Sequence, residues 1–317
     1  AVTADVPESI LEYQSATADE PQGRLDLAKW LVSTEHPLTA RVIVNQLWQL
    51  CFGAGLVRTP EDFGLQGERP THPELLDYLA IEFMQNGWDV QHVLRLIVTS
   101  KTYRQSSELV GAAFDRDPDN RWLARGSRFR LPSWMIRDAA LRSSGLMNDA
   151  LGGPTVMPYQ PDGVWSEMFM GRFRYQASQG VAQYRRTLYA FWRRSAAPTF
   201  LFDSSQRRIC EVRPRQTNTP LQALTMLNDL NIMTSARNLA KNAITQRTEV
   251  SQQLEYLFEA VLCRRPDRHE LTVLAREYDL AMKHYYQGEA GKEQAVELLR
   301  FGQPEQFSGG ENILVPT

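Results

Sequence analysis

Two regions of helical hydrophobic spacing enclose a long segment in which this spacing is lost. Apolar residues recur three and four positions apart in residues 24–32 and 39–52, and again after Thr219-Pro220. This period is typical of amphipathic helices. The sequence therefore predicts a mainly α-helical protein, with helical N-terminal and C-terminal lobes around a loop region rich in arginine and aromatic residues. A short strand or hairpin is compatible with this loop region.

Capping signals indicate where several of these helices begin and end. Gly53 predicts the end of the helix over 39–52. Thr71 and Glu74, with proline between them, predict a capping box, because a Thr hydroxyl and a Glu carboxylate can bond the first backbone N–H groups of a helix. Asp89 is expected to cap the helix that follows.

The C-terminal region carries the same kind of signals. Thr219 and Pro220 predict the start of one long helix through Leu221, Leu224 and Leu227 and beyond. Further helices are expected around residues 250–263 and 268–286, with Asp267 as the cap of the second.

The loss of helical period in the middle of the chain sets the predicted domain organisation. We interpret residues 1–23, which are polar and contain prolines, as a linker or arm. The rest is predicted to be one domain over 24–317, made of a helical lobe (24–110), a loop-rich basic centre (111–215), a second helical lobe (216–300) and a truncated tail (301–317).

The sequence shows neither a signal peptide nor a long apolar run. The chain begins at Ala1 rather than Met, so we interpret it as a processed or excised fragment, and the missing signal peptide then says little about compartment. Its longest apolar runs span only a few residues, against the roughly 20 that a membrane-spanning helix needs. No membrane span is therefore expected.

The charge of the 317-residue chain is unevenly distributed. The formal net charge is −2, yet 30 of the 35 basic residues are arginine. Residues 116–215 hold 17 arginines and no lysine against 8 acidic residues, a net of +9, which leaves −11 for the remainder. The acidic remainder disfavours nucleic-acid binding, which would need a continuous exposed basic stripe.

The segment from Tyr184 to Arg215 combines arginine doublets with aromatic residues. Guanidinium groups bind carboxylate, sulfate or phosphate through two parallel hydrogen bonds, and aromatic faces stack on rings or cations. The segment therefore predicts a site for an anionic ligand. Its candidate binding residues are Arg185, Arg186, Arg193, Arg194, Arg207, Arg208, Arg213, Arg215, Tyr189 and Trp192.

A structural role for these arginines remains the alternative. Buried arginines often tie loops together by bonding backbone carbonyls and acids, and this segment is rich in loops. The exposure of the arginine side chains separates the two interpretations.

Residues that could carry chemistry are scattered. Acid–base catalysis needs carboxylates that converge on a cleft. The candidates are Asp162, Glu167 and Asp203, together with Glu61-Asp62, and each can equally be a cap, a turn residue or an arginine partner. Cys210 lies among arginines, which can lower a thiol pKa, but no histidine is close in sequence to act as its base. Whether the chain is an enzyme stays open.

Metal and haem motifs are missing from the sequence. The five histidines form no His-x-x-x-His pair, and the three cysteines form neither a zinc pair nor a Cys-x-x-Cys-His haem attachment site. We therefore expect no metal and no cofactor in this chain.

Many short blocks of the chain together resemble the planctomycete-type PSD-one family, catalogued as domain of unknown function 1553. The resemblance spans about residues 20–300. In chain order the blocks are 24–32 (RLDLAKWLV), 36–42 (HPLTARV), 45–48 (NQLW), 52–53 (FG), 55–57 (GLV), 59–64 (TPEDFG), 72–77 (HPELLD), 87–88 (GW), 97–100 (IVTS), 102–107 (TYRQSS), 184–189 (YRRTLY), 202–203 (FD), 215–224 (RQTNTPLQAL) and 227–229 (LND).

The resemblance implies a setting rather than an activity. Family members are typically exported multidomain proteins with this domain at the C-terminus, behind a c-type cytochrome domain. A periplasmic or secreted location follows, with haem c only on N-terminal sequence outside this chain and the preceding domains of the same polypeptide as partners. The family has no assigned catalytic residues, so none can be transferred.

Together these observations lead to one functional hypothesis and its rivals. The chain is predicted to be a binding or partner-docking domain of an exported, cytochrome c-associated protein, with an acidic or sulfated polysaccharide as the natural anionic ligand in that setting. The main alternative is a hydrolase or lyase that acts on complex carbohydrate, with Asp162, Glu167 or Asp203 as acid–base groups. Nucleic-acid binding is a third, disfavoured, interpretation.

Overall fold

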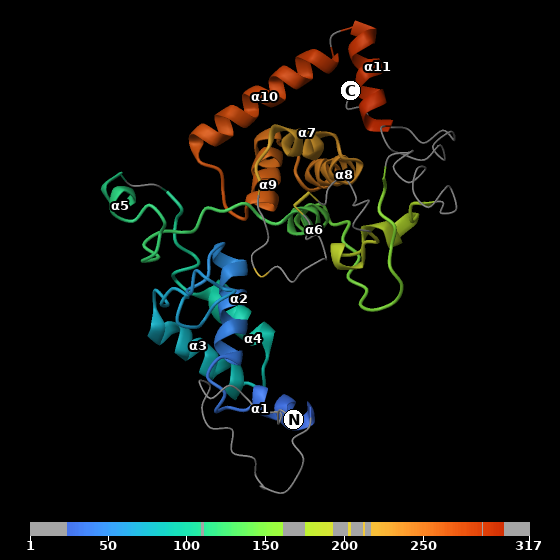
Figure 1. Cartoon of the computed structure of the whole chain (residues 1–317). Helices are drawn as coiled ribbons and strands as arrows, with labels where there is room; N and C mark the ends of the chain where they lie inside the picture. The colour runs from blue at the N-terminus through green and yellow to red at the C-terminus, as the bar shows by residue number, and fades with distance from the viewer. Residues whose placement is uncertain are drawn as a thin grey trace, which may run out of the picture. The chain divides into compact units, whose positions relative to one another are not determined.

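The computed structural model in Figure 1 is an assembly of helices joined by long loops. It describes residues 24–108, 111–160, 175–192, 202–203, 212, 217–286 and 288–300. The chain divides into two compact units, the first Ala1–Arg130 with Cys210–Arg213 and the second Leu131–Ile209 with Pro214–Thr317. This division falls inside the predicted central region.

The first unit is built around three helices that contact one another. These are α2 (Thr39–Phe52), α3 (Pro73–Gln85) and α4 (Val90–Thr99), which lie side by side in Figure 1. Their apolar faces form one buried core, in which Trp48 and Phe52 of α2 stack with ring centroids 4.2 Å apart. The short helices α1 (Arg24–Leu31) and α5 (Gly111–Arg116) complete the unit.

A buried asparagine fixes the chain where it leaves α2. The Asn45 amide donates to the carbonyl of Val57 (3.0 Å) and accepts from its N–H (2.9 Å). The side chain thus makes the two hydrogen bonds with Val57 that a neighbouring backbone segment would otherwise make. Gly55 lies against this amide, and a Cβ there would come within 2.6 Å of Asn45. This arrangement sets the position of the residues that follow, including Arg58.

The predicted caps of the first unit are partly confirmed. Gly53 ends α2 in the left-handed conformation (φ 79°), and the Asp89 side chain accepts the N–H groups of Gln91 and His92. The capping box at Thr71 is wrong, because the N–H and hydroxyl of Thr71 both bond the Leu56 carbonyl and α3 begins without a side-chain cap. A long-range backbone partner has replaced the local one.

The second unit contains the remaining described helices. They are α6 (Ser133–Ser143), the 3-10 turns η2 (Gly180–Tyr184) and η3 (Thr187–Tyr189), α7 (Pro220–Asn228), α8 (Leu230–Gln246), α9 (Val250–Leu262), α10 (Arg268–Tyr286) and α11 (Gly288–Arg300). Helices α6, α8 and α9 pack together, α7 contacts α8, and α10 contacts α9 and α11.

The long helix predicted to start at Thr219 is two helices. Thr219 does form a reciprocal capping box with Gln222 at the start of α7. Asp229 then takes an extended conformation, and its carboxylate accepts the N–H groups of Asn231 and Ile232, so it caps α8. A good N-cap residue inside a helical hydrophobic pattern therefore interrupts the helix.

The predicted fold class is confirmed, since the protein is mainly α-helical. In the described part of the chain there is no strand. The region expected to hold one contributes only two isolated bridges, between Asn148 and Arg185 and between Val156 and Ala190. No helix among the residues described is long and apolar enough to cross a membrane.

Candidate functional site

Arg185, the first arginine of the predicted binding segment, is a buried structural residue. It is only 6% exposed. Its guanidinium donates to the carbonyls of Pro154 (2.8 Å), Ala150 (3.0 Å) and Gly152, and lies 3.7 Å from the centroid of the Tyr189 ring. The Tyr189 hydroxyl in turn accepts the Gly152 N–H (2.8 Å). Arg185 and Tyr189 therefore hold the loop at residues 150–154.

A second buried arginine, which sequence reasoning did not single out, supports the same region from α6. Arg137 donates to the carbonyls of Arg185 (2.9 Å) and Gln183 (2.7 Å) and to the Thr187 hydroxyl (3.2 Å). Burial lowers the pKa of this guanidinium, and the nearby Asp138 carboxylate acts in the opposite direction. Nothing in the local sequence distinguishes Arg137 from an exposed helix arginine.

The other predicted binding residues divide into two groups. Arg186 is exposed, with its guanidinium 3.7 Å from the Asp149 carboxylate, and Trp192 is half-buried. The remaining candidates, Arg193, Arg194, Arg207, Arg208, Arg213 and Arg215, lie outside the described residues.

The candidate acid–base groups are not assembled into a site by the part of the chain that is described. Asp203 accepts the N–H (2.8 Å) and hydroxyl (2.6 Å) of Thr217 and the Gln222 amide (3.3 Å), which ties the chain to the start of α7. Asp62 accepts the Gly64 N–H in a turn, and Glu61 is exposed. Asp162, Glu167 and Cys210 lie outside the described residues.

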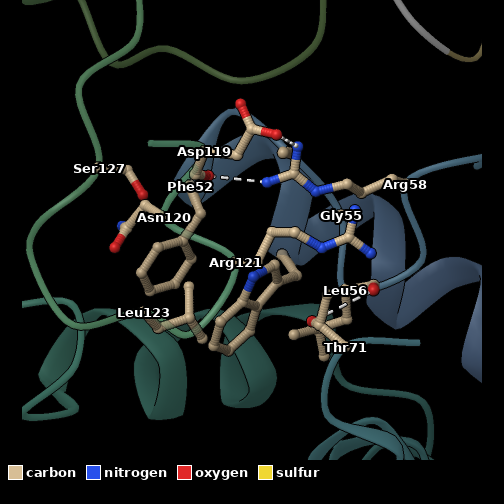
Figure 2. A pocket seen from close by; sticks show the side chains of 12 residues that line it. Phe52, Gly55, Leu56, Arg58, Thr71, Asp119, Asn120, Arg121, Leu123 and Ser127 are labelled. Carbon is tan, nitrogen blue, oxygen red and sulfur yellow. Dashed lines mark hydrogen bonds and ion pairs between the residues drawn. The ribbon is translucent and has the colours of Figure 1, made fainter. Parts of the chain in front are cut away.

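A pocket in the first unit brings two other arginines together (Figure 2). Its cavity volume is about 40 Å³. The apolar side comes from Trp48, Phe52, Leu56 and Leu123, and the polar side carries Arg58 and Arg121. We call it the Arg58–Arg121 pocket. One wall follows α2, and the other is the loop over residues 117–127.

Asp117 organises the loop that presents Arg121. Its buried carboxylate accepts the N–H groups of Arg121 (2.7 Å) and Trp122 (2.8 Å), and the Arg125 guanidinium donates to the Asp117 and Pro118 carbonyls. Burial raises the pKa of the Asp117 carboxyl, but the two N–H donors and the positive charge of Arg125 outweigh it and hold this pKa below its ordinary value. The loop thus depends on an ionised Asp117.

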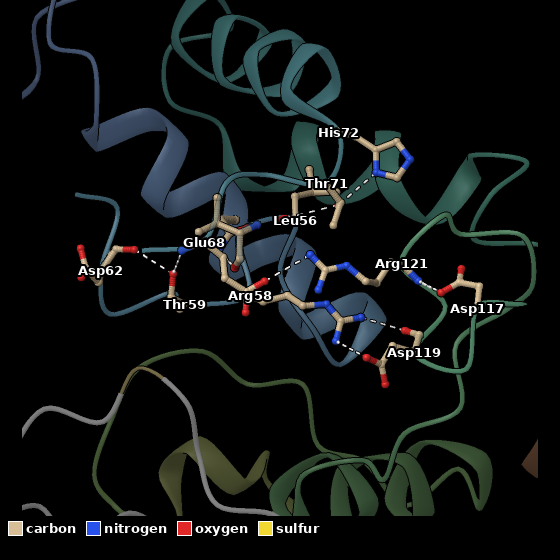
Figure 3. Close-up of polar contacts among 12 residues, drawn as sticks. Leu56, Arg58, Thr59, Asp62, Glu68, Thr71, His72, Asp117, Asp119 and Arg121 are labelled. Carbon is tan, nitrogen blue, oxygen red and sulfur yellow. Dashed lines mark hydrogen bonds and ion pairs between the residues drawn. The ribbon is translucent and has the colours of Figure 1, made fainter. Parts of the chain in front are cut away.

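Each arginine of the pocket has an acidic neighbour, as Figure 3 shows. Arg58 donates to the Asp119 carbonyl (2.8 Å) and lies 3.8 Å from its carboxylate. Arg121 donates through Nη2 to Glu68 Oε2 (3.2 Å), and the two side chains are 44% and 47% exposed. Arg121 is therefore accessible and only weakly held.

An exposed aromatic residue follows Arg121. Trp122 is 67% exposed, although its backbone N–H donates to the Asp117 carboxylate. A tryptophan with a fixed backbone and an exposed side chain can offer its indole face to a ligand ring.

Sequence reasoning missed Arg58, Arg121 and Trp122. The one available signal was the run Asp117-Pro118-Asp119-Asn120, whose residue types favour turns. A turn directly before an arginine and a tryptophan places both on a loop, where binding residues are frequent. Arg58 gave no signal, because its position depends on the pairing of Asn45 with Val57.

Metal ligation can be assessed for the same described residues. Within them, no three His, Cys, Asp or Glu side chains lie grouped as a metal ion would require. Cys51 and Cys263 are free thiols far apart in sequence, and burial raises the pKa of the Cys51 thiol. The Arg58–Arg121 pocket is therefore the best-supported candidate site.

Comparison with known proteins gives one match. A family model described as a protein of unknown function (DUF1553) matches residues 23–278 of the chain. No curated protein and no solved structure matches it.

Proposed function

The chain belongs to the DUF1553 family, as its sequence blocks predicted, and we propose that it is a binding or partner-docking domain that recognises an anionic polysaccharide. The observation that carries this proposal is the Arg58–Arg121 pocket, and the exposed Trp122, which follows Arg121 in the same loop, supports it. Its setting, as part of an exported protein with a cytochrome c domain, follows from the family resemblance and belongs to the proposal.

An anion fits the pocket because of its guanidinium groups. Arginine keeps its charge at all physiological pH values and binds oxyanions through a planar fork of N–H donors. Arg121 faces the pocket with nearly half of its side chain exposed, so an incoming anion can reach it. The cavity admits a group the size of about three water molecules.

A sugar polymer fits the surface around the pocket. A small pocket can hold one anionic substituent of a sugar while the sugar ring stays outside. The exposed Trp122, the residue after Arg121, offers an indole face in the same loop on which a ring can pack.

The hydrogen bonds, ion pairs and pKa of the carboxylates near the pocket favour binding over acid–base catalysis. Asp117 accepts two backbone N–H groups, Glu68 pairs with Arg121, and Asp119 lies next to Arg58. A general acid at neutral pH needs a raised pKa, whereas the pKa of Asp117 is lowered.

The test is calorimetric titration with polygalacturonate, a sulfated polysaccharide and neutral dextran. Binding to the anionic polymers but not to dextran is expected, and Arg121→Gln and Trp122→Ala should each weaken it about five- to tenfold. Arg95→Gln is the matched control, since Arg95 is an exposed arginine on α4. Equal binding by Arg121→Gln and the wild type, or equal binding of dextran, would contradict the proposal.

A further inference from the structure

We propose that the anionic group taken by the Arg58–Arg121 pocket is a carboxylate carried on a sugar ring, and that Glu68 is its built-in competitor for Arg121. This inference rests on the proposed function and narrows it to uronic acid polymers. Its basis is that a carboxylate of the chain itself already occupies the place on Arg121 that a ligand would need.

The contact between Glu68 and Arg121 can be exchanged easily. One guanidinium nitrogen meets one carboxylate oxygen at 3.2 Å, and both side chains are about half exposed. An exposed ion pair of this kind contributes little to stability and weakens further in salt. A ligand carboxylate can therefore replace Glu68 without a large cost in protein stability.

Only side chains have to move in this exchange. The Glu68 N–H donates to the Thr59 hydroxyl (2.9 Å), and the preceding Gly67 has no room for a side chain, since a Cβ there would lie 2.1 Å from the Asp62 carbonyl oxygen. The Arg121 backbone is held in turn by Asp117. The two backbones stay fixed, and Glu68 swings away while Arg121 remains.

The geometry favours a carboxylate over a sulfate ester. A planar carboxylate can take two parallel hydrogen bonds from the fork of one guanidinium, whereas Glu68 takes only one from Arg121. A sulfate ester can accept the same two hydrogen bonds, but its third charged oxygen then needs a donor from another direction. Arg58 is held on the Asp119 carbonyl, so Arg121 supplies the main fork. In a uronic acid the carboxylate is attached directly to the ring, so the ring lies at the mouth of the pocket when the carboxylate is bound.

The experiment compares a galacturonic acid trimer with a sulfated neutral trisaccharide, titrated at low salt into the wild type, Glu68→Gln and Glu61→Gln. Glu68→Gln should bind the galacturonate about two- to fivefold more tightly than the wild type. Glu61→Gln removes the same charge from an exposed position in the same loop and should bind like the wild type. Glu68→Asp, whose shorter carboxylate reaches less far toward Arg121, should also bind more tightly while the net charge is unchanged.

The possible results separate the two proposals. Equal affinities of the wild type and both Glu68 variants would reject the competitor role and leave the proposed function standing. An equal gain in Glu61→Gln would reduce the effect to general charge repulsion, which also rejects the competitor role. A larger gain for the sulfated trisaccharide would overturn the choice of a carboxylate. Absence of binding in every variant, with either sugar, would reject the proposed function itself.

Discussion

Arg185 and Arg121 come from the same arginine-rich part of the sequence but have opposite roles in the structure. Arg185 is buried, with three backbone carbonyls around its guanidinium and a tyrosine ring against it. Arg121 lies in a pocket and forms an ion pair with the exposed Glu68. The first holds a loop in place and the second can exchange its partner. Burial, more than local charge, decides which arginine is available to a ligand.

The comparison changes how the basic centre should be interpreted. The net charge of residues 116–215 suggested one extended anion site. In the described residues, Arg137 and Arg185 instead donate hydrogen bonds to backbone carbonyls within a loop-rich region, as the alternative interpretation anticipated. Anion binding by the six central arginines that lie outside the described residues stays a prediction.

The largest expected effect separates structural from exposed arginines. Arg137→Ala removes the donors for the buried Arg185 carbonyl, the partly buried Gln183 carbonyl and the Thr187 hydroxyl, so it should lower the free energy of unfolding by about 3–5 kcal/mol. Urea denaturation measures the loss. Arg142→Ala is the control on the same helix, because Arg142 pairs with Asp149 at an exposed position and should contribute less than about 1 kcal/mol. Similar losses of unfolding free energy in Arg137→Ala and Arg142→Ala would contradict the distinction between structural and exposed arginines.

The next effect concerns the loop that presents Arg121. Asp117→Asn leaves one of two N–H donors without an acceptor, so stability should fall by about 1–3 kcal/mol and binding of polygalacturonate should weaken. Because the pKa of Asp117 is lowered in the folded state, its contribution is present above its ordinary value of about 4 and is lost as pH falls further.

Unfolding measured from pH 6 down to pH 2.5 tests this dependence. The difference between the wild type and Asp117→Asn should shrink as pH falls below about 4. Asp119→Asn is the control, since its carboxylate is exposed and forms only a long ion pair with Arg58, at 3.8 Å. A pH-independent difference for Asp117→Asn would show that its charge does not stabilise the loop.

The sequence predicted what local interactions decide. The helical class, the stop at Gly53 and the caps at Asp89 and Thr219 depend on residues a few positions apart, and all are confirmed. The pocket depends on pairs far apart in sequence, such as Arg121 with Glu68, so no local pattern could reveal it. Thr71 shows the same limit, because its partner at Leu56 lies fifteen residues away and replaced the expected cap.

The smallest expected effect comes from an exposed ion pair that is also a helix cap. Arg264 donates two hydrogen bonds to Glu270 (2.8 and 2.6 Å), while the Asp267 N–H donates to Glu270 and the Glu270 N–H donates to Asp267. Arg264 and the Asp267 N–H together lower the pKa of Glu270 to about 2. This arginine thus holds its partner more firmly than Arg121 does, although both are exposed.

Glu270→Gln should therefore lower the thermal unfolding midpoint slightly at neutral pH. A lowered pKa stabilises the fold above the ordinary value of 4.5, and this contribution is lost as pH falls toward about 2. Calorimetry of the variant and of Glu277→Gln, an exposed pair with Arg276 on the same helix, measures the effect. If Glu277→Gln shows the same pH-dependent change, the cap adds nothing to the ion pair. If only Glu270→Gln does, an exposed arginine gains a structural role when a backbone N–H also holds the carboxylate of its partner. The Glu68 carboxylate has Arg121 as its described partner, which leaves the Arg121 contact exchangeable.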